Sequence, residues 1–277
     1  MRILITGALG MLGQAVVREA NRQDLTAIPA DLNEFDICDP AATRAFLTEA
    51  APEAVVHCAA YTAVDKAEEE PDRAMSVNEA GTRNVAEACS KLGASFLYVS
   101  TDYVFDGCSD KPYLPEAERN PLGVYGKSKA AGEIATIETG GEWIIARSSW
   151  LFGGGGKNFV DTMISAAGSR SELRVVDDQV GRPTFTGDLA KILLTLTRLR
   201  SRGIFHAANE GTATWFELAA EALRLRGISS RVIPILSKDW PTPAPRPAYS
   251  VLDLEKTSSQ LDFPIRSWRE ALEQYLR

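Results

Sequence analysis

The sequence predicts an α/β protein in which a doubly wound parallel sheet precedes a smaller C-terminal lobe of mixed α/β structure. Strand and helix patterns alternate through roughly the first 150 residues and then become irregular. The run from Ala54 to Ala60 is almost continuously apolar, as in a central parallel strand covered on both faces. We expect a dinucleotide-binding domain over residues 1–150. Residues 151–277 are expected to form mainly a substrate lobe, with some segments returning to the first domain.

The first strand pattern, Arg2 to Thr6, runs into a glycine turn with the spacing Gly-x-x-Gly-x-x-Gly, formed by Gly7, Gly10 and Gly13. A helical pattern follows. Glycines permit a tight turn and a close approach of the backbone to a pyrophosphate, and the helix N-terminus then faces the phosphates. Any tight turn between a strand and a helix could share this spacing. Its place at the start of an α/β pattern favours a dinucleotide site in a Rossmann-type domain.

The second strand pattern, Thr26 to Asp31, ends on a carboxylate near the usual place of an acid that binds ribose hydroxyls. That role favours NADH, because a carboxylate repels a 2′-phosphate. A turn residue at the strand end is an equally good interpretation of Asp31. Asp39 and Pro40 then predict a helix start, as N-cap and first helical residue.

Several later segments have clear patterns. The small residues Ala59 and Ala60 end the central strand and leave room for a cofactor, and the strand Ser95 to Ser100 brings Thr101 and Asp102 to the same edge. The other expected elements are a helix around Ala74 to Leu92, a loop from Pro112 to Pro121, a strand from Trp143 to Ser149, a short strand at Val175 and Val176, a helix capped by Asp188 or Thr186, a helix from Phe216 to Leu225, a strand-like run from Ile228 to Leu236, and a last helix from about Trp268.

Tyr125 and Lys129 lie one turn apart on a predicted helix that ends at Glu138. If the pair faces a pocket, the ammonium favours the phenolate and lowers the pKa of the phenol from about 10. Many helix surfaces carry such a pair. The catalytic interpretation therefore depends on Thr101 and the glycine turn, which should converge on the same edge of the sheet.

Composition excludes several classes of function. The 277 residues carry a net charge of −7 with scattered Lys and Arg, which argues against a nucleic acid or an anionic membrane as partner. No apolar run approaches the length of a membrane span, and no signal peptide is apparent. The four cysteines contain no Cys-x-x-Cys pair, which disfavours zinc or a redox pair and fits a cytoplasmic protein. His57 and His206 are expected in strands or the core.

A Thr, a Tyr and a Lys in this order on this scaffold resemble the extended short-chain dehydrogenase/reductase superfamily. Longer blocks resemble one family within it, the dTDP-4-dehydrorhamnose reductases, and this resemblance covers essentially the whole chain. The blocks are residues 59–68, 100–107, 121–129, 147–150, 178–184 and 246–247.

The resemblance implies reduction of dTDP-6-deoxy-L-lyxo-4-hexulose at C4 to dTDP-L-rhamnose, with NADPH or NADH as hydride donor. Tyr125 would give the proton, Thr101 would hydrogen-bond the substrate oxygen, and Lys129 would also hold the nicotinamide ribose. The expected cofactor residues are Gly7, Gly10, Met11, Leu12, Gly13, Asp31, Asp36, Ile37, Ala59, Ala60, Tyr61, Thr62, Tyr125 and Lys129. The expected substrate residues are Thr101, Asp102, Tyr103, Val104, Trp150 and Arg246. The flat ring of Trp150 suits a deoxysugar, although a core Trp is the alternative.

The alternatives concern the metal and the oligomeric state, related enzymes on the same scaffold, and a non-catalytic subunit. Some members of the family dimerise around magnesium through a Glu at the position of Ala15, so magnesium is not expected here, and monomer or homodimer is undecided. A related dehydratase would carry a Glu where Tyr103 stands, whereas a related epimerase is harder to exclude. A non-catalytic subunit resembling the regulatory β subunit of methionine adenosyltransferase would lack Trp150.

Overall fold

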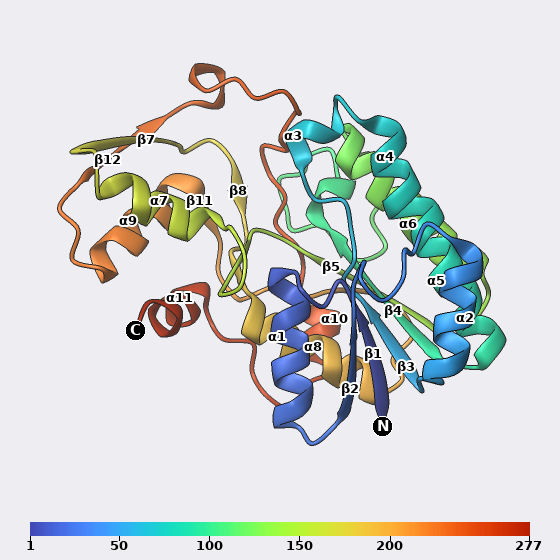
Figure 1. The fold of residues 1–277 in the computed structure, drawn as a ribbon. Helices are drawn as coiled ribbons and strands as arrows, with labels where there is room; N and C mark the ends of the chain where they lie inside the picture. Colours follow the sequence, from blue (N-terminus) through green and yellow to red (C-terminus); the bar gives the residue numbers. More distant parts are fainter.

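The computed structural model describes all residues from 1 to 277, and its centre is a sheet of six parallel strands (Figure 1). The strand order is β10-β5-β4-β3-β1-β2. The strands are β1 (Arg2–Thr6), β2 (Thr26–Ala30), β3 (Ala54–His57), β4 (Ser95–Thr101), β5 (Trp143–Ser148) and β10 (Gly203–His206). The chain runs from β1 to β2 on one side and then to β3 on the other. The carboxyl ends of β1 and β3 therefore flank the switch point where ligands bind in such sheets. The predicted doubly wound sheet is confirmed.

Helices cover both faces of the sheet, because alternate residues of a strand point to opposite faces. Ile3 and Ile5 pack in one core with α1 (Met11–Arg22) and α8 (Thr186–Arg198). Leu4 packs in a second core with the helices of the other face. These are α2 (Pro40–Ala50), α5 (Thr82–Leu92) and, beside α5, α6 (Val124–Glu138), as Figure 1 shows. The sheet is thus buried on both sides, as its apolar strands predict.

The helix expected from Ala74 to Leu92 begins earlier and is not regular. It starts as α4 (Pro71–Met75), with Pro71 in the first turn. Backbone N–H groups in the first turn have no partner within the helix, so a proline there costs no hydrogen bond. A π-helical segment, η1 (Ser76–Gly81), separates α4 from α5. A π-helical turn contains one extra residue and often lies at a functional site. No periodicity in the sequence indicated it.

The C-terminal lobe is built from short strand pairs and three longer helices. β7 (Glu172–Val176) pairs in parallel with β12 (Arg231–Ile235), and two-residue strands form the other pairs. Those strands are β6 (Leu151–Phe152), β8 (Val180–Gly181), β9 (Thr184–Phe185) and β11 (Ala213–Thr214). The helices are α7 (Phe159–Ala167), α9 (Trp215–Leu225) and α11 (Trp268–Leu276). The buried indole of Trp268 lies in the core that they share. Four short helices complete the fold: α3 (Val64–Ala67), η2 (Asp102–Val104), η3 (Ser237–Asp239) and α10 (Glu255–Ser258).

Two elements from the second half of the chain complete the domain of the six-stranded sheet. β10 pairs with β5 at the edge of the sheet, and α8 packs against α1 on one face. The helix α8 starts differently from the prediction. Its N-cap is Phe185, so neither Thr186 nor Asp188 caps it. Asp188 instead accepts hydrogen bonds from Asn209 (2.7 Å) and Arg266 (2.7 Å), because these partners fold onto the first turn.

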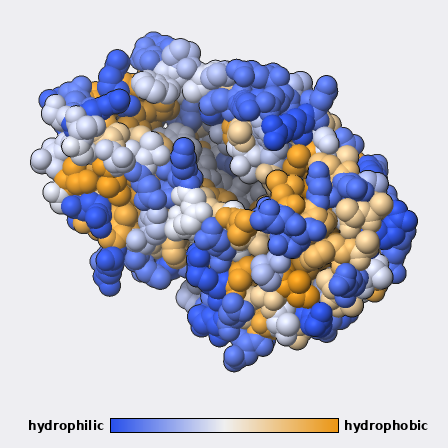
Figure 2. Space-filling model, in the orientation of Figure 1, coloured by the Kyte–Doolittle hydropathy of each residue, from blue (hydrophilic) through white to orange (hydrophobic).

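The two parts of the molecule face one another across a hollow. Figure 2 shows this face, on which the surface is depressed between the part that carries the parallel sheet and the part that carries α7 and α9. The carboxyl ends of the parallel strands point toward the second part. None of the helices has the length and apolar character that a membrane span requires.

Candidate active site

The glycine turn lies directly against the end of the central strand. Gly7 has φ +65°, and a Cβ added to it would meet the Ala59 nitrogen at 2.6 Å. A Cβ on Gly13 would meet the Gly7 oxygen at 2.1 Å, so the start of α1 packs too closely on the turn for any other residue. Gly10 is the N-cap of α1 and has no side chain, so no capping side chain accepts from the N–H groups of the first turn, which include those of Met11 and Leu12. This cradle fits an anionic pyrophosphate.

Asp31 lies beside the glycine turn at the end of β2. Its carboxylate accepts the backbone N–H groups of Leu9 (3.0 Å) and Leu32 (2.9 Å). The side chain therefore ties the turn to the second strand while remaining partly exposed. Both interpretations of Asp31 are compatible with this place. Farther along, Asp36 is exposed, whereas Ile37 is buried and packs against Gly81.

The residues after β3 are held by an asparagine that the sequence did not single out. Asn78, in the π-helical segment, accepts from the N–H of Tyr61 (2.8 Å) and donates to its carbonyl (3.0 Å). Its amide also donates to Ser128 Oγ (2.9 Å), which in turn donates to the Tyr125 carbonyl (2.8 Å). Asn78 is fully buried, so this one side chain fixes the segment of Ala59, Ala60, Tyr61 and Thr62 relative to α6. Asn78 stands among other polar residues of its helix, so no sequence signal indicated this role.

Thr101, Tyr125 and Lys129 lie on two elements, β4 and α6, that pack against one another. Thr101 is the last residue of β4, and Tyr125 and Lys129 occupy the first two turns of α6. The Thr101 hydroxyl donates to Asp102 (3.0 Å) and accepts from the N–H of Tyr103 (3.2 Å). The Tyr103 ring meets the Tyr125 ring edge-on, with centroids 5.6 Å apart.

The prediction that Lys129 lowers the pKa of Tyr125 is wrong for this structure. Burial raises the pKa of Tyr125 to about 12, with only partial opposition from a hydrogen bond to Thr101. Lys129 is itself buried, and it donates to the Val99 carbonyl at 2.7 Å and lies 4.1 Å from the centre of the Tyr98 ring. Burial lowers the pKa of Lys129 to about 7. Burial therefore dominates the pKa of both groups, and it favours the neutral form of each.

Asp102 is buried, and both of its carboxylate oxygens are hydrogen-bonded. It accepts from the hydroxyls of Thr101 and of Ser250, a residue far away in the sequence that carried no local signal. Burial raises the pKa of Asp102 to about 6, although the Ser250 and Thr101 hydrogen bonds oppose the shift. The Asp102 side chain therefore orients Thr101. It is not free to meet a ligand directly.

The family model of the RmlD substrate binding domain matches residues 1–277. A dTDP-4-dehydrorhamnose reductase from Streptomyces griseus is 44% identical to this chain, over 98% of this chain and 91% of the relative. This chain belongs to the RmlD family.

Two further similar proteins carry information about the cofactor and the substrate. The solved structure of dTDP-4-dehydrorhamnose reductase from Bacillus anthracis in complex with NADP has a TM-score of 0.96 and 37% identity, and covers 99% of this chain and 98% of that chain. A Streptomyces antibioticus protein is 41% identical over 98% of this chain and 93% of its own length. It is named as a probable dTDP-4,6-dihydroxy-2-methyloxan-3-one 4-ketoreductase. The RmlD relatives thus include reductases of more than one 4-keto sugar nucleotide.

Three predicted substrate residues of this RmlD chain have unexpected surroundings. Trp150, at φ +50°, stacks on Trp215 with centroids 3.6 Å apart and planes 4° from parallel, which occupies one face of its indole. Arg246 forms two hydrogen bonds to the Asp65 carboxylate, at 2.9 and 3.0 Å. The side chain of Val104 is fully buried in an apolar cluster, so it belongs to the core and does not line the site.

The position of the family's metal-site Glu does not fit a cation in this chain. Ala15 lies in α1, is 4% exposed and packs in the core between α1 and α8. A buried methyl group offers no oxygen to magnesium, which takes only oxygen ligands.

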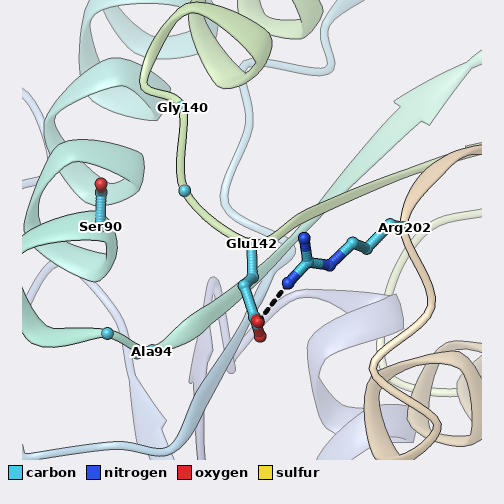
Figure 3. A pocket seen from close by; sticks show the side chains of 7 residues that line it. Ser90, Ala94, Gly140, Glu142 and Arg202 are labelled. Carbon is cyan, nitrogen blue, oxygen red and sulfur yellow. Dashed lines mark hydrogen bonds and ion pairs between the residues drawn. The ribbon is translucent and has the colours of Figure 1, made fainter.

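The opposite edge of the sheet has a concavity of its own, with a volume of about 310 Å³. Figure 3 shows that Glu142 points toward Arg202 there, with Ser90 and Gly140 on the surrounding segments. This pocket lies next to the amino ends of β4 and β5. It contains none of the predicted site residues, so the candidate active site remains at the carboxyl edge.

Proposed function

We propose that this chain is an NAD(P)H-dependent oxidoreductase that reduces the C4 keto group of dTDP-6-deoxy-L-lyxo-4-hexulose to dTDP-L-rhamnose. The observation that carries the proposal is the convergence of Thr101, Tyr125 and Lys129 at the edge where the glycine turn lies. Membership of a family of 4-keto sugar nucleotide reductases supports the same reaction.

The glycine turn and the segment after β3 would hold the cofactor. The N–H groups of Met11 and Leu12 would bind its pyrophosphate. Asp36 and Ile37 would border the adenine, and residues 59–62 would line the cofactor. The carboxylate of Asp31 would accept the ribose hydroxyls of NADH. The NADP complex of a 37% identical relative supports NADPH as the alternative.

The reduced nicotinamide supplies a hydride to the carbonyl carbon when it is bound. Negative charge then develops on the carbonyl oxygen, and a proton must reach it. Tyr125 would give that proton, because its raised pKa keeps the phenol protonated at neutral pH. The Lys129 ammonium would stabilise the phenolate that remains, and Thr101 would fix the geometry between Asp102 and the phenol.

The substrate would lie in the hollow between the two parts of the molecule. Trp150 and Tyr103 would offer aromatic surface to the deoxysugar, with Trp150 presenting the face that Trp215 leaves free. Arg246 would break its ion pair with Asp65 and bind an anionic group of the sugar nucleotide instead. The free thiols of all four cysteines support a cytoplasmic site of action.

The test is turnover with a panel of 4-keto sugar nucleotides. Purified protein is mixed with NADPH or NADH and either dTDP-6-deoxy-L-lyxo-4-hexulose or dTDP-4-keto-6-deoxy-D-glucose, and cofactor oxidation is followed by absorbance. We expect oxidation with the first sugar, and NMR of the product identifies the configuration at C4. A protein that binds NADPH but turns over no keto sugar would be a regulatory subunit, and the proposal would be wrong. Preference for the second sugar would retain the reductase and change the substrate.

A further inference from the structure

Lys129 is buried with few polar contacts of its own. Its side chain is 2% exposed, and its ammonium donates to the Val99 carbonyl at 2.7 Å over the Tyr98 ring. Removing an ammonium from water is unfavourable unless an opposite charge compensates it. The question is which group supplies that charge.

Most titratable groups around Lys129 are neutral at pH 7. At the end of β3, burial lowers the pKa of His57 to about 3 and raises the pKa of Cys58 to about 12. Burial also raises the pKa of Tyr98, on β4, and of Tyr125, on the same helix as Lys129. None of these four groups provides negative charge at neutral pH.

Glu133 lies one helical turn beyond Lys129, on the same side of α6, and is fully buried. Burial alone would raise the pKa of its carboxyl. The paired guanidinium of Arg147 on β5 (2.8 and 2.7 Å) and the hydroxyl of Ser100 (2.6 Å) nevertheless hold that pKa below its usual value. Arg119 adds a third donor at 3.2 Å. Glu133 is therefore ionised inside the protein.

The same carboxylate is connected to the strand that carries the reacting groups. Ser100, which donates to Glu133, lies between Val99, whose carbonyl binds Lys129, and Thr101. One buried side chain of α6 thus holds the last residues of β4. The other buried carboxylate nearby, Asp102 in η2, instead accepts hydrogen bonds from Ser250 and Thr101.

We propose that Glu133 is a positioning residue for the reduction: it holds the end of β4 against α6 and supplies the negative charge that stabilises the Lys129 ammonium. Arg147 fixes the Glu133 carboxylate in place. The inference rests on the proposed function, because the charge of Lys129 affects turnover only if the chain catalyses that reduction. Neutralising Glu133 should make Lys129 lose its proton at a lower pH, since a negative neighbour raises the pKa of an ammonium.

The experiment compares the pH dependence of kcat in the wild type and in Glu133→Gln. Activity that needs the Lys129 ammonium falls as the pH rises through the pKa of Lys129. We expect this alkaline limb to move about one pH unit lower in Glu133→Gln, the order of shift that one nearby charge produces. The matched control is Glu138→Gln on the same helix, whose exposed carboxylate pairs with Arg83 outside the site. Its profile should equal that of the wild type.

A second variant tests the proposal if Glu133→Gln fails to fold, which could happen because Glu133→Gln leaves the Arg147 guanidinium buried without its ion-pair partner. Glu133→Gln/Arg147→Met removes both charges and retains an acceptor for Ser100. It should show a downward movement of the limb that is smaller than in Glu133→Gln, because the loss of the positive Arg147 guanidinium opposes the loss of the Glu133 charge. The double variant should keep its circular dichroism spectrum and melt cooperatively. An unmoved limb in either folded variant overturns the proposal and leaves Glu133 a purely structural residue. Inactive wild-type protein would instead contradict the proposed function.

Discussion

At the scale of single residues, the Tyr125 phenol is a proton donor held in its protonated form. Its raised pKa means that the proton leaves only when a stronger base develops beside it, as a carbonyl oxygen does when hydride arrives. Asp102, Ser250 and the Tyr103 backbone restrict the Thr101 hydroxyl next to it. The geometry is therefore set before a ligand binds.

Replacing Tyr125 by Phe should remove this proton and little else. We expect kcat to fall by about 10²- to 10⁴-fold, the usual size of a lost acid–base group, with a nearly unchanged cofactor Kd. Steady-state kinetics and a fluorescence titration with NADPH measure the two quantities. A turnover close to wild type would show that another group gives the proton.

Asp31→Asn tests the two interpretations of that carboxylate. Asparagine retains an oxygen for the Leu9 N–H but loses the charge, so the glycine turn should keep its shape. If Asp31 binds the ribose, the Kd for NADH should rise while the Kd for NADPH falls or stays constant. Equal changes for both cofactors would identify Asp31 as a turn residue only. Isothermal titration of each cofactor distinguishes these outcomes.

At the scale of elements, the helix that carries Tyr125 and Lys129 is capped from a distance. Its N-cap, Gly123, has no side chain, and Glu68 supplies the missing acceptor by bonding to the Val124 N–H at 2.8 Å. A carboxylate at this place also interacts favourably with the positive end of the helix dipole.

Glu68→Ala should therefore destabilise the protein by about 1 kcal/mol, the typical contribution of an N-cap. Urea denaturation measures this change, and Glu69→Ala at an exposed neighbouring position is the control, with an expected change near zero. Tyr125 lies one residue beyond the capped N–H, so kcat should fall more than the loss of stability alone explains. Equal stability of the two variants would show that Glu68 does not cap α6.

The elements show why sequence reasoning succeeded in part. Alternation, glycines and caps are local signals, so the doubly wound parallel sheet, the Asp39 cap and the end of α6 agree with the prediction. The π-helical segment and the start of α8 do not. A single extra residue in a helix leaves its apolar pattern almost unchanged, and the true partners of Asp188 are Asn209 and Arg266, which only the tertiary fold brings near.

Only part of the candidate site follows from the order of the strands and helices. Thr101, Tyr125 and Lys129 end or begin elements whose order predicts their convergence. Ser250 and Trp215 come near the site from distant segments in which the sequence shows no motif. Arg147 lies in a block that carries the family resemblance, but its contact with Glu133 depends on the tertiary fold. The shifted pKa values of Tyr125 and Lys129 follow from burial, which a pair spacing cannot report.

At the scale of the whole molecule, the two parts of the chain are interleaved. α8 contributes fully buried leucines to the core around β1 and α1, and β10 covers the edge of β5. Residues 1–150 alone lack both elements, so the part of one sheet face that α1 does not cover would be exposed to water.

We expect a fragment of residues 1–150 to aggregate or to melt without a cooperative transition. The Thr184 N–H donates to the Trp150 carbonyl at 3.1 Å, so a short glycine linker can join residue 150 to residue 184. A chimera of residues 1–150 and 184–210 regains α8 and β10, and it should be soluble with a cooperative melt in calorimetry. A fragment 1–150 that melts as cooperatively as the chimera would contradict the interleaved core.

The stacked indoles of Trp150 and Trp215 give the protein an optical signal of its own. Two nearly parallel rings 3.6 Å apart couple their electronic transitions, and this coupling depends steeply on their separation and angle. Trp150 lies two residues beyond the end of β5, whereas Trp215 begins a helix of the C-terminal lobe. The near-ultraviolet circular dichroism of this pair therefore reports how the lobe lies against the sheet, without any added label.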